Sequence, residues 1–507
     1  MDINELRKKI NAIDDVLSDA FKKRMEVALE IARYKQENGL PVYDPRREQA
    51  VLERLTADCD DVMAAFMRDL YGKLFALSRD YQHRNMAKGR FGLIGHPLSH
   101  SCSPRVHQLL GGEGYALWDT PPEALDAFLR AGAFEGMNVT IPYKQAVIPF
   151  CAELGHTARL IGSVNTIVKR PDGTLFGDNT DAYGFLCMAQ RAGIDFKGKK
   201  VLVLGSGGTS RTACAVIQSA GGEPVVISRS GKNNYDNLHL HADADVLVNT
   251  TPVGMYPHAN AQPVDLAAFP RLQGVLDVIY NPLRTRLMQQ AEALGIPCGG
   301  GLYMLCAQAA RAREIFTGEK IAAEVLETAY QTLERERQSI VLIGMPGCGK
   351  STVAQALSQR LQLPLVDTDA EIVRRAGREI PEIFAADGEA AFRALEAAVI
   401  ADACATGGKV IATGGGAILH EENRKNLRMN AHVIWLQRDL QKLPFSGRPL
   451  SKGFDAIEEM YAIREPLYRA CADVILDNNG VLEKTIERAA LEGQSPLSSS
   501  PRKPALG

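Results

Sequence analysis

Residues 339–351 contain the feature that most constrains the fold. The apolar run Ser339-Ile340-Val341-Leu342-Ile343 precedes Gly344-Met345-Pro346-Gly347-Cys348-Gly349-Lys350-Ser351, which fills every fixed position of a P-loop. Such glycines let successive backbone N–H groups turn toward phosphates, Lys350 can reach the β/γ oxygens, and Ser351 can ligate Mg²⁺. We therefore predict a strand, a loop and a helix that bind a nucleotide through Gly344, Gly347, Cys348, Gly349, Ser351 and Thr352.

The position of this loop indicates a chain with several domains. A P-loop domain needs about 150–170 residues. The loop begins at residue 344 of 507, so other domains must occupy the first two-thirds. A prior of about 150 residues per domain predicts roughly three. With 46% hydrophobic and 23% charged residues, the composition is that of globular domains with real cores.

Charge, hydropathy and cysteine usage argue against several classes of protein. The net charge of −2 at pH 7 gives no reason to expect a nucleic-acid partner. No apolar run approaches the ~18 residues of a membrane span, and the first five residues are unlike a signal peptide. Ten cysteines without a Cys-x-x-Cys predict neither disulfides nor zinc, and His239-Leu240-His241 lacks a third ligand nearby. We expect a cytoplasmic protein without membrane partners.

The chain changes character three times along its length. Residues 1–88 have helical periodicity, and residues 89–336 alternate between strand and helix patterns. The α/β part has two lobes, one of about 89–195 plus C-terminal helices and one of about 196–300 that opens with Lys199-Lys200-Val201-Leu202-Val203-Leu204. A charged helix, 319–338, leads into the P-loop domain, 337–490. Residues 491–507 are predicted to be a disordered tail rich in Ser and Pro.

The first helix carries two cations on the side that should face a bundle. Apolar residues recur every seven positions from Ile3 to Ile31, and Arg24 occupies one of these positions. Lys35, eleven residues further on, shares nearly the same face about 16 Å along the axis. A guanidinium placed there needs a partner or a ligand. The pair indicates a pocket for a di-anion; the alternative is that Arg24 pairs with a buried Asp or Glu.

The order and spacing of polar residues over 1–88 resemble the helical class of chorismate mutases. The residues that carry the resemblance are Leu6-Arg7, Ile10, Asp14, Asp15, Arg24, Lys35, Asp44-Pro45-Arg46-Arg47-Glu48, Ser78 and Gln82. The resemblance implies an intertwined dimer in which Arg7 from the partner chain joins Arg24 and Arg47 on two carboxylates. It also implies Asp44 and Glu48 near the hydroxyl, Ser78 lining the site, and Lys35 and Gln82 donating to the ether oxygen.

Such a site suits a Claisen rearrangement, which requires no acid, base or nucleophile. The reaction is accelerated by holding the di-anion in a compact conformer and by stabilising charge that develops on the ether oxygen. An alternative is that residues 1–88 form a dimerising or sensor module that binds chorismate or prephenate without turnover.

A glycine-rich turn follows the strand that opens the second lobe. Gly205, Gly207 and Gly208 depart from Gly-x-Gly-x-x-Gly, so the turn alone is weak evidence for a dinucleotide. The next strand ends in Ser228-Arg229-Ser230, and Lys232 follows shortly after. A residue that recognises a ribose 2′-OH at this position would be Asp or Glu. A basic residue at this place favours a 2′-phosphate and therefore NADP(H).

An ordered set of motifs across about 245 residues resembles shikimate dehydrogenase. The motifs are Ser99 to Pro104, Asn138 to Lys144, Gly162 to Thr166, Gly177 to Asp181, Asn249 to Met255 and Met304 to Ala309. The resemblance implies Ser101, Ser103 and Thr140 around a substrate carboxylate, Asn165, Asp181 and Gln308 on hydroxyls, and Lys144 with Asp181 as the acid–base pair. Quinate dehydrogenase is the closest rival. Only about 20 residues separate Arg229 from Asn249, which predicts a shortened helix between them.

Lys144 and Asp181 are residue types that suit reduction of a carbonyl. Lys144 can stabilise and protonate the alkoxide that develops as hydride arrives, and a neighbouring Asp181 would control its position and charge state.

Residues 338–478 resemble shikimate kinase. The motifs are Leu365-Val366-Asp367-Thr368-Asp369, Ile383 to Glu396, Ile411 to Gly416, Arg448-Pro449-Leu450 and Arg464 to Tyr468. We expect the first to end a strand with two carboxylates facing one direction. The resemblance implies Asp367 with Ser351 on Mg²⁺, Asp369 on the substrate hydroxyls and as a candidate base, Arg393 and Arg464 on the substrate carboxylate beside Gly414, Gly415 and Gly416, and Lys350 and Arg448 on the transferring phosphoryl group.

The lid of the P-loop domain deviates from that family. Eleven residues separate Leu436 from Arg448, several fewer than usual, and a second lid arginine is missing or displaced to Arg438. We expect this shortening of the lid to weaken its contact with the adenine more than it alters the phosphoryl-transfer chemistry. Another small-metabolite kinase, such as a gluconate kinase, is the alternative.

These resemblances predict a multidomain enzyme of aromatic amino-acid biosynthesis. The fold class is an all-α chorismate-mutase-like domain, an α/β two-lobed domain with a Rossmann-like NADP lobe, and an α/β P-loop domain like the nucleoside-monophosphate kinases. Substrates would be chorismate, 3-dehydroshikimate and shikimate, and cofactors NADP(H), ATP and Mg²⁺. We expect a homodimer through residues 1–88.

Overall fold

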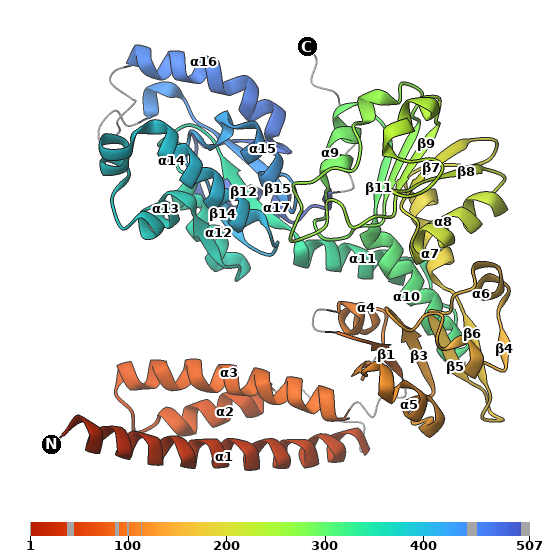
Figure 1. Ribbon diagram of the computed structural model, residues 1–507. Coiled ribbons are helices and arrows are strands. Elements are labelled where there is room, and N and C mark those ends of the chain that lie inside the picture. Colours follow the sequence, from red (N-terminus) through yellow and green to blue (C-terminus); the bar gives the residue numbers. More distant parts are fainter. Residues whose placement is uncertain are drawn as a thin grey trace. The chain divides into compact units, whose positions relative to one another are not determined.

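A computed structural model describes residues 2–37, 45–86, 91–98, 101–112, 114–443 and 454–497. It divides into two compact units, whose helices and strands are labelled in Figure 1. Unit 1 comprises Met1–Asn179 and Ala312–Glu319, and unit 2 comprises Thr180–Arg311 and Lys320–Gly507. Within the described residues, no helix combines the length and apolar character that crossing a bilayer requires.

The N-terminal part of unit 1 is helical, as predicted, and is called here the helical domain. It consists of α1 (Ile3–Glu37), α2 (Pro45–Thr56) and α3 (Asp61–Met86), with α1 and α2 both packed against α3. Among its described residues, the buried apolar side chains are Met25, Ala28, Ala64 and Phe75. Such tertiary contacts supply most of the stability of helices in proteins, more than helix propensity does.

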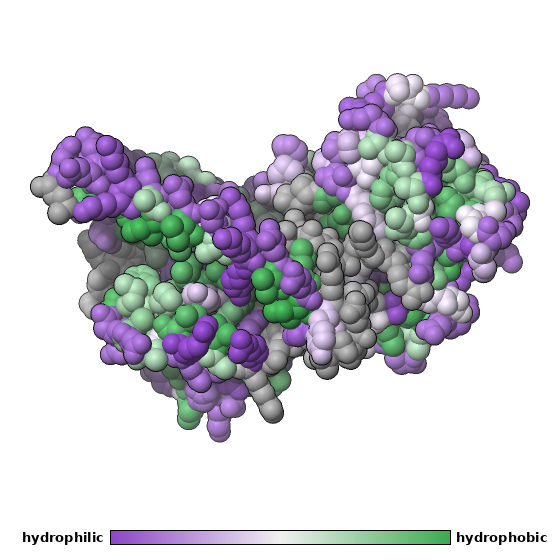
Figure 2. All heavy atoms as spheres, turned by 90° about the horizontal axis from the view of Figure 1, so that it is seen from below, coloured by the Kyte–Doolittle hydropathy of each residue, from purple (hydrophilic) through white to green (hydrophobic). Residues whose placement is uncertain are grey.

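Most of the seven-residue apolar pattern on α1 is exposed in the single chain. Ile10 is 58% exposed and Leu17 is 59% exposed, and α3 also presents Phe66 at 68%. Figure 2 shows hydrophobic patches among the hydrophilic side chains on the face of the helical domain that is seen from below in Figure 1. The pattern therefore does not form a core within one chain.

The rest of unit 1 is an α/β layer structure, called here the first lobe. A six-stranded mixed sheet has the order β2-β1-β3-β5-β6-β4, in which β5 is antiparallel to both its neighbours. Helices pack around a core that includes Ile94, Met137 and Ile167. The elements are β1 (Phe91–Gly95), α4 (Ser103–Leu109), β2 (Ala116–Asp119), η1 (Pro122–Ala124), α5 (Leu125–Ala131), β3 (Gly136–Val139), η2 (Ile148–Phe150), β4 (Glu153–Leu154), α6 (His156–Ile161), β5 (Thr166–Lys169) and β6 (Leu175–Asp178).

The first part of unit 2, called here the second lobe, contains a five-stranded parallel sheet of order β11-β10-β9-β7-β8. Val201 to Leu204 are fully buried, as expected for a strand covered by helices on both faces. The elements are α7 (Asp181–Arg191), β7 (Lys200–Leu204), α8 (Gly208–Ser219), β8 (Glu223–Ile227), η3 (Tyr235–His241), β9 (Val246–Asn249), η4 (Leu266–Ala268), β10 (Gly274–Asp277), α9 (Arg286–Ala293), β11 (Cys298–Gly300), α10 (Gly301–Thr317), whose residues from Ala312 onward belong to unit 1, and α11 (Ala323–Arg337).

The second part of unit 2 is the P-loop domain. Its parallel sheet has the order β13-β14-β12-β15-β16, with β12 at the centre and a large hydrophobic core cluster around it. The elements are β12 (Ser339–Ile343), α12 (Lys350–Leu361), β13 (Leu365–Asp367), α13 (Thr368–Ala376), α14 (Ile380–Cys404), β14 (Val410–Ala412), η5 (Ala417–Leu419), α15 (Glu421–Leu427), β15 (Ala431–Gln437), η6 (Leu440–Lys442), α16 (Phe454–Cys471), β16 (Val474–Asp477) and α17 (Leu482–Gly493).

Two sequence predictions about local structure have clear outcomes. The connection between β8 and β9 contains only the short 3₁₀ helix η3, so the predicted shortening is confirmed. The predicted start of a disordered tail at residue 491 is wrong, because α17 continues to Gly493. The buried side chain of Gln338 donates to the carbonyls of Gly493 and Ser495, at 2.9 and 3.1 Å, and holds this end of the chain. Residues 498–507 lie outside the described residues.

Candidate functional site

A pocket of about 580 Å³ lies between the three helices of the helical domain. It brings together most of the residues predicted for the di-anion site. From α1 come Arg24 and Lys35, from α2 Arg47 and Glu48, and from α3 Ser78. Sequence reasoning missed several other lining residues, among them Lys23, Arg54 and Tyr71. Arg54 adds a further cation, and its helical spacing of seven from Arg47 is the signal that pointed to the same face.

Arg24 has the environment of a ligand-binding cation. Its guanidinium carbon lies 5.7 Å from the centre of the Phe75 ring, and its Nη1 is buried without a hydrogen-bond partner among the described residues. Burial lowers the pKa of Arg24, and the charge of Glu48 opposes that shift. The alternative of a salt bridge to a buried carboxylate finds no such ion pair among the described residues, so the unused N–H group favours an anionic ligand.

Arg7 does not line this pocket. It lies on an exposed part of α1, more than four turns before Arg24. This placement agrees with the expectation that Arg7 serves a different pocket. Asp44 and the side chain of Gln82 lie outside the described residues.

In the first lobe, the predicted carboxylate- and hydroxyl-binding residues cluster at one end of the sheet. Thr140 and Lys144 follow the end of β3, and Asn165 immediately precedes the antiparallel β5. The backbone connects them, since Val139 N donates to Asn165 O at 2.7 Å and Val164 N donates to Lys144 O at 2.8 Å. Asn165 is 3% exposed, and its Oδ1 accepts from Thr166 Oγ1 at 3.0 Å.

Ser101 and Ser103 lie at the start of α4. The backbone N–H of Ser103 donates to the hydroxyl of Ser101 at 3.2 Å, so the two side chains stay close together. Both serines are half-buried. Hydroxyl groups at the beginning of a short helix suit hydrogen bonds to a carboxylate.

Two residues predicted for the same substrate belong to unit 2. Asp181 is the first residue of α7, and Gln308 lies on α10. Gln308 Nε2 donates to Leu305 O at 2.9 Å, and Thr180 Oγ1 donates to Gln308 Oε1 at 3.4 Å. Since Lys144 lies in unit 1, its pairing with Asp181 stays a prediction.

The glycine-rich turn of the second lobe fits a phosphate-bearing cofactor. Gly205 has φ +105°, and a Cβ there would lie 2.9 Å from Thr250 Oγ1, so a side chain is excluded. The space around Gly207 and Gly208 is open, and no side chain caps the N-terminus of α8. The N–H groups of that helix end are thus available to a phosphate.

The basic strand end lies beside this turn. Strands β7 and β8 are parallel neighbours with Leu204 opposite Ile227, and Gly205 N donates to Ile227 O at 2.8 Å. Ser228, Arg229 and Ser230 follow directly, with Arg229 and Ser230 exposed. A guanidinium at this edge fits a ribose 2′-phosphate.

The P-loop has the geometry that its sequence predicts. Gly344, Gly347 and Gly349 all have positive φ, at +147°, +82° and +101°. Lys350 is 8% exposed, and its Nζ donates to Gly344 O at 2.9 Å and to Met345 O at 3.0 Å. The ammonium is therefore held inside the loop. Cys348 is fully buried, and Thr352 is exposed on α12.

Ser351 and Asp367 form the predicted pair for a divalent cation. Ser351 Oγ donates to Asp367 Oδ2 at 2.8 Å. Mg²⁺ takes few protein oxygens and keeps several waters, so one hydroxyl and one carboxylate suit it. Among the described residues there is no group of three or more His, Cys, Asp or Glu side chains that would make a different metal site.

The prediction that a strand carries both Asp367 and Asp369 is wrong in detail. Strand β13 ends at Asp367, whose Oδ1 accepts from the backbone N–H groups of Asp369 and Ala370, at 3.0 and 3.3 Å, and caps α13. Asp369 consequently projects from the first turn of a helix. A carboxylate cap competes well with strand extension because it satisfies otherwise orphaned N–H groups.

The predicted acceptor residues of the P-loop domain meet around the loop 414–416. A Cβ on Gly416 would lie 2.5 Å from Arg393 Nη1, and one on Gly414 would lie 2.5 Å from Asp369 Oδ1. Arg464, 5% exposed, donates to Gly415 O at 3.0 Å. The same Gly415 packs against Pro346 of the P-loop. The two arginines, the carboxylate and the phosphate-binding loop therefore lie around one site.

Two further residues support this site and were not predicted to act in it. Glu396 accepts from Arg393 Nη1 at 2.9 Å, and burial raises the pKa of this carboxyl. Asn478 Nδ2 donates to Cys348 O at 2.7 Å and so anchors the backbone of the P-loop. Arg448 lies outside the described residues, whereas Arg438 is half-buried with an unpartnered Nε among the described residues.

Three family models match successive parts of the chain. The model of chorismate mutase type II matches residues 6–83, that of the shikimate dehydrogenase substrate-binding domain matches 93–167, and that of shikimate kinase matches 346–492.

Curated relatives cover the middle of the chain. A shikimate dehydrogenase (NADP(+)) of Methanopyrus kandleri is 36% identical over 271 residues, which span 47% of this chain and 93% of the relative. The chain belongs to the shikimate dehydrogenase family. A second member of this family, from Thermus thermophilus, is 39% identical over 247 residues, with 45% of this chain and 92% of the relative covered.

A solved structure joins two of the same domain types. It is a chorismate mutase/shikimate 5-dehydrogenase fusion protein from Clostridium acetobutylicum, 33% identical, with a TM-score of 0.46 and coverage of 48% of this chain and 96% of that chain. In this chain a shikimate kinase domain follows the dehydrogenase domain. It is a multifunctional enzyme with chorismate mutase, shikimate dehydrogenase and shikimate kinase domains.

Proposed function

We propose that this chain catalyses three reactions: reduction of 3-dehydroshikimate to shikimate with NADPH, phosphorylation of shikimate to shikimate 3-phosphate with ATP and Mg²⁺, and rearrangement of chorismate to prephenate. One observation carries the proposal furthest. In the P-loop domain, the Ser351–Asp367 pair and Lys350 lie beside a cradle of Arg393, Arg464 and the loop 414–416. A phosphoryl donor and a carboxylate-bearing acceptor would thus meet there.

In the kinase reaction, the residues mainly position the reactants and neutralise charge. Arg393 and Arg464 would hold the shikimate carboxylate, and Asp369 would accept a hydrogen bond from the hydroxyl to be phosphorylated. Bound Mg²⁺ and ATP would supply the transferable phosphoryl group. Lys350 would counter the charge that develops on that group, together with Arg448.

In the dehydrogenase reaction, Lys144 and Asp181 are assigned the acid–base roles. Bound NADPH would supply the hydride. Lys144 would protonate the alkoxide oxygen, and Asp181 would orient it, while Ser101, Ser103 and Thr140 hold the substrate carboxylate. The names of the relatives favour shikimate over quinate as the substrate.

For the mutase reaction we propose a homodimer of the helical domain. The apolar residues of α1 and α3 that are exposed in one chain, including Ile10, Leu17 and Phe66, support it, because a second copy would cover them. The absence of Arg7 from the pocket that contains Arg24 and Arg47 supports a contribution of Arg7 to the other chain's site.

We also assign the protein to the cytoplasm. All ten cysteines are free, from Cys59 to Cys471, which supports a reducing compartment. NADPH and ATP are both available there.

One coupled assay tests the proposal. The full chain is given 3-dehydroshikimate, NADPH and ATP, and shikimate 3-phosphate is the product to be detected. If NADPH is consumed without ATP consumption, the kinase assignment fails. If neither is consumed, the dehydrogenase assignment fails, and the kinase is then tested by supplying shikimate and ATP directly. Chorismate is tested separately, since binding without formation of prephenate would favour the sensor alternative for residues 1–88.

The basic end of β8 gives a prediction about cofactor choice. NADP⁺ should exceed NAD⁺ in kcat/KM for shikimate oxidation, and Arg229→Ala should reduce that preference chiefly through the cofactor KM. The reason is that the 2′-phosphate is remote from hydride transfer, so its contacts contribute uniform binding. Arg271→Ala, which removes another exposed arginine of the second lobe, is the control. Equal use of both cofactors by the unaltered enzyme would disprove a 2′-phosphate site.

A further inference from the structure

The chain between β10 and α9 is hydrogen-bonded to the P-loop domain through its backbone. Within unit 2, Leu283 N donates to Asn430 Oδ1 at 2.8 Å, and Arg284 N donates to Met429 O at 2.9 Å. Asn430 is itself part of the P-loop domain's core, since its carbonyl accepts from Ser339 N at the start of β12. The second lobe is therefore connected directly to the central strand of the neighbouring domain.

Arg284 is a buried cation of this junction. It is 4% exposed, and its Nη2 donates to Ala431 O at 2.6 Å. Both Nη atoms lie 3.4 Å from the carboxylate of Asp473, and Glu292 of the second lobe lies 3.9 Å away. A guanidinium removed from water needs such partners, and all but Glu292 belong to the P-loop domain.

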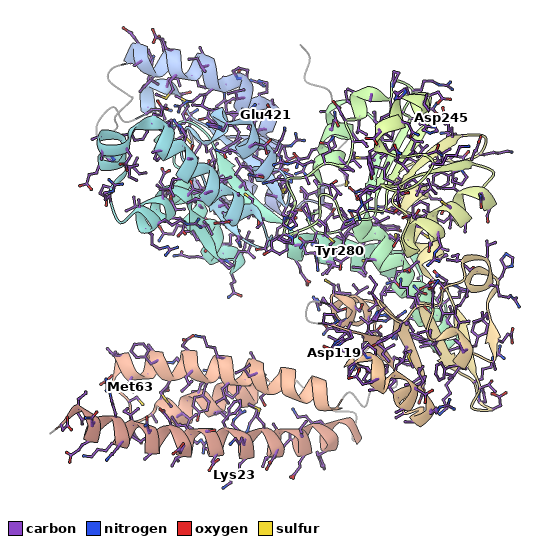
Figure 3. All side chains as sticks on the ribbon, viewed as in Figure 1. Lys23, Met63, Asp119, Asp245, Tyr280 and Glu421 are labelled. Carbon is purple, nitrogen blue, oxygen red and sulfur yellow. The ribbon has the colours of Figure 1, made fainter. Side chains whose placement is uncertain are left out.

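Side chains of α9 and α15 extend the contact in both directions. Arg286, also 4% exposed, donates to Asn426 Oδ1 at 2.7 Å and to Glu422 Oε2 at 2.9 Å. In the opposite direction, Arg428 of the P-loop domain donates to Glu292 Oε2 of the second lobe at 2.9 Å. Glu421, labelled in Figure 3, lies at this junction, where it lines a pocket together with Arg286 and Gln289. The name α9–α15 interface is used here for Leu283, Arg284, Arg286, Gln289 and Glu292 against Glu422, Lys425, Asn426, Arg428 to Ala431 and Asp473.

The covalent connection between the two parts is equally tight. Helix α11 ends at Arg337 and β12 begins at Ser339, so Gln338 is the whole linker. Gln338 is 3% exposed and hydrogen-bonded to the last turn of α17. Domain boundaries normally fall in exposed, flexible segments with few crossing contacts. Neither property is found here.

We propose that the second lobe and the P-loop domain form one cooperative folding unit, held together by the α9–α15 interface. The second lobe of the dehydrogenase is then the stabilising partner of the kinase domain, and its α9 is the docking surface. Cofactor binding at the glycine-rich turn would stabilise the kinase domain, and damage to the second lobe would destabilise it.

The two tryptophans of the chain allow the proposal to be tested in the full-length protein. Trp118 lies in the first lobe, and Trp435 lies on β15 of the P-loop domain, 1% exposed. In a Trp118→Phe background, fluorescence reports the unfolding of the P-loop domain alone. Leu202→Ala is then introduced; Leu202 is fully buried in the second lobe. Since this variant needs no ligand, the test is independent of the proposed activities.

We expect Leu202→Ala to lower the thermal midpoint reported by Trp435 by at least about 5 °C, as a large core cavity does within one cooperative unit. If that variant does not fold, Ile227→Val, in the same lobe, is expected to give a smaller shift of the same sign. NADP⁺ at about 100 times its Kd should raise the midpoint. If the thermal midpoint reported by Trp435 is the same in the second-lobe variants as in the Trp118→Phe background, the proposal is overturned.

Arg284→Met separates the interface from the linker. It should reduce the effect of Leu202→Ala on the Trp435 midpoint by more than half, whereas Arg271→Met, at an arginine whose side chain is 64% exposed, should leave it unchanged. Arg286→Gln serves if Arg284→Met does not fold. An undiminished effect in the interface variant would show that coupling passes through Gln338, and the role of the α9–α15 interface would be rejected.

Discussion

Lys144→Ala should lower dehydrogenase turnover by at least ~10²-fold, the usual contribution of a general acid–base group. Lys144 follows β3, and its carbonyl accepts from Val164 N next to Asn165, so the side chain starts from a well-anchored backbone. The loss should appear in kcat rather than in the cofactor KM, because the ammonium acts on the oxygen that changes charge. The measurement is steady-state oxidation of shikimate with NADP⁺.

Kinase turnover of the same polypeptide is the internal control and should not change. Lys169→Ala is the matched control variant: Lys169 lies at the far end of β5 and donates to Gly132 O at 3.0 Å. Near-normal shikimate oxidation by Lys144→Ala would remove Lys144 from the mechanism.

The second large effect is expected in the mutase. Arg7→Ala and Arg24→Ala should each be nearly inactive, with losses on the order of 10²–10³-fold, because each leaves charge of the di-anion uncompensated in a partly dry site. Arg24 already has a buried, unpartnered Nη1 among the described residues, so its removal takes away a donor that only a ligand would use. The measurement is chorismate disappearance catalysed by the full-length variants.

Mixing the two inactive variants tests whether the site is shared between chains. In a mixed dimer, one site carries both defects and the other carries neither. With random equimolar exchange, half of the dimers are mixed, so activity should return to about a quarter of that of the unaltered enzyme. Lys22→Ala, at an exposed lysine of α1, should stay active throughout. If subunits exchange measurably and no activity returns, Arg7 does not complete the partner's pocket.

Contiguous motifs were predictable because their function depends on local backbone geometry. The P-loop glycines adopt positive φ, as residue type and spacing implied, and Ser351 reaches Asp367, as the resemblance to shikimate kinase implied. Gly205 likewise excludes a side chain beside Thr250. In these cases a strand, a turn and a helix start follow one another, so few alternative conformations compete.

Sites assembled from distant segments were predicted as residue sets but without their surroundings. The family resemblance named Arg24, Lys35 and Arg47, whereas Arg54 and Tyr71 emerged from the packing of α1, α2 and α3. The support of the P-loop by Asn478 also depends on the end of β16, since Asn478 directly follows that strand and is 130 residues away from Cys348. Periodicity indicates which face of a helix is apolar, but it does not specify the partner of that face.

The α9–α15 interface had no local signal at all. Arg284 and Arg286 stand in a polar stretch that reads as solvent-exposed, yet both are 4% exposed and bind groups 136 to 189 residues further along the chain. Whether an arginine contacts water or a buried carboxylate depends on how two folded surfaces pack together. Its net contribution to stability is the difference between the free-energy cost of removing the charge from water and the gain from its interactions with those particular partners. Local sequence determines propensity and backbone geometry, whereas burial of charge is a property of the assembled fold.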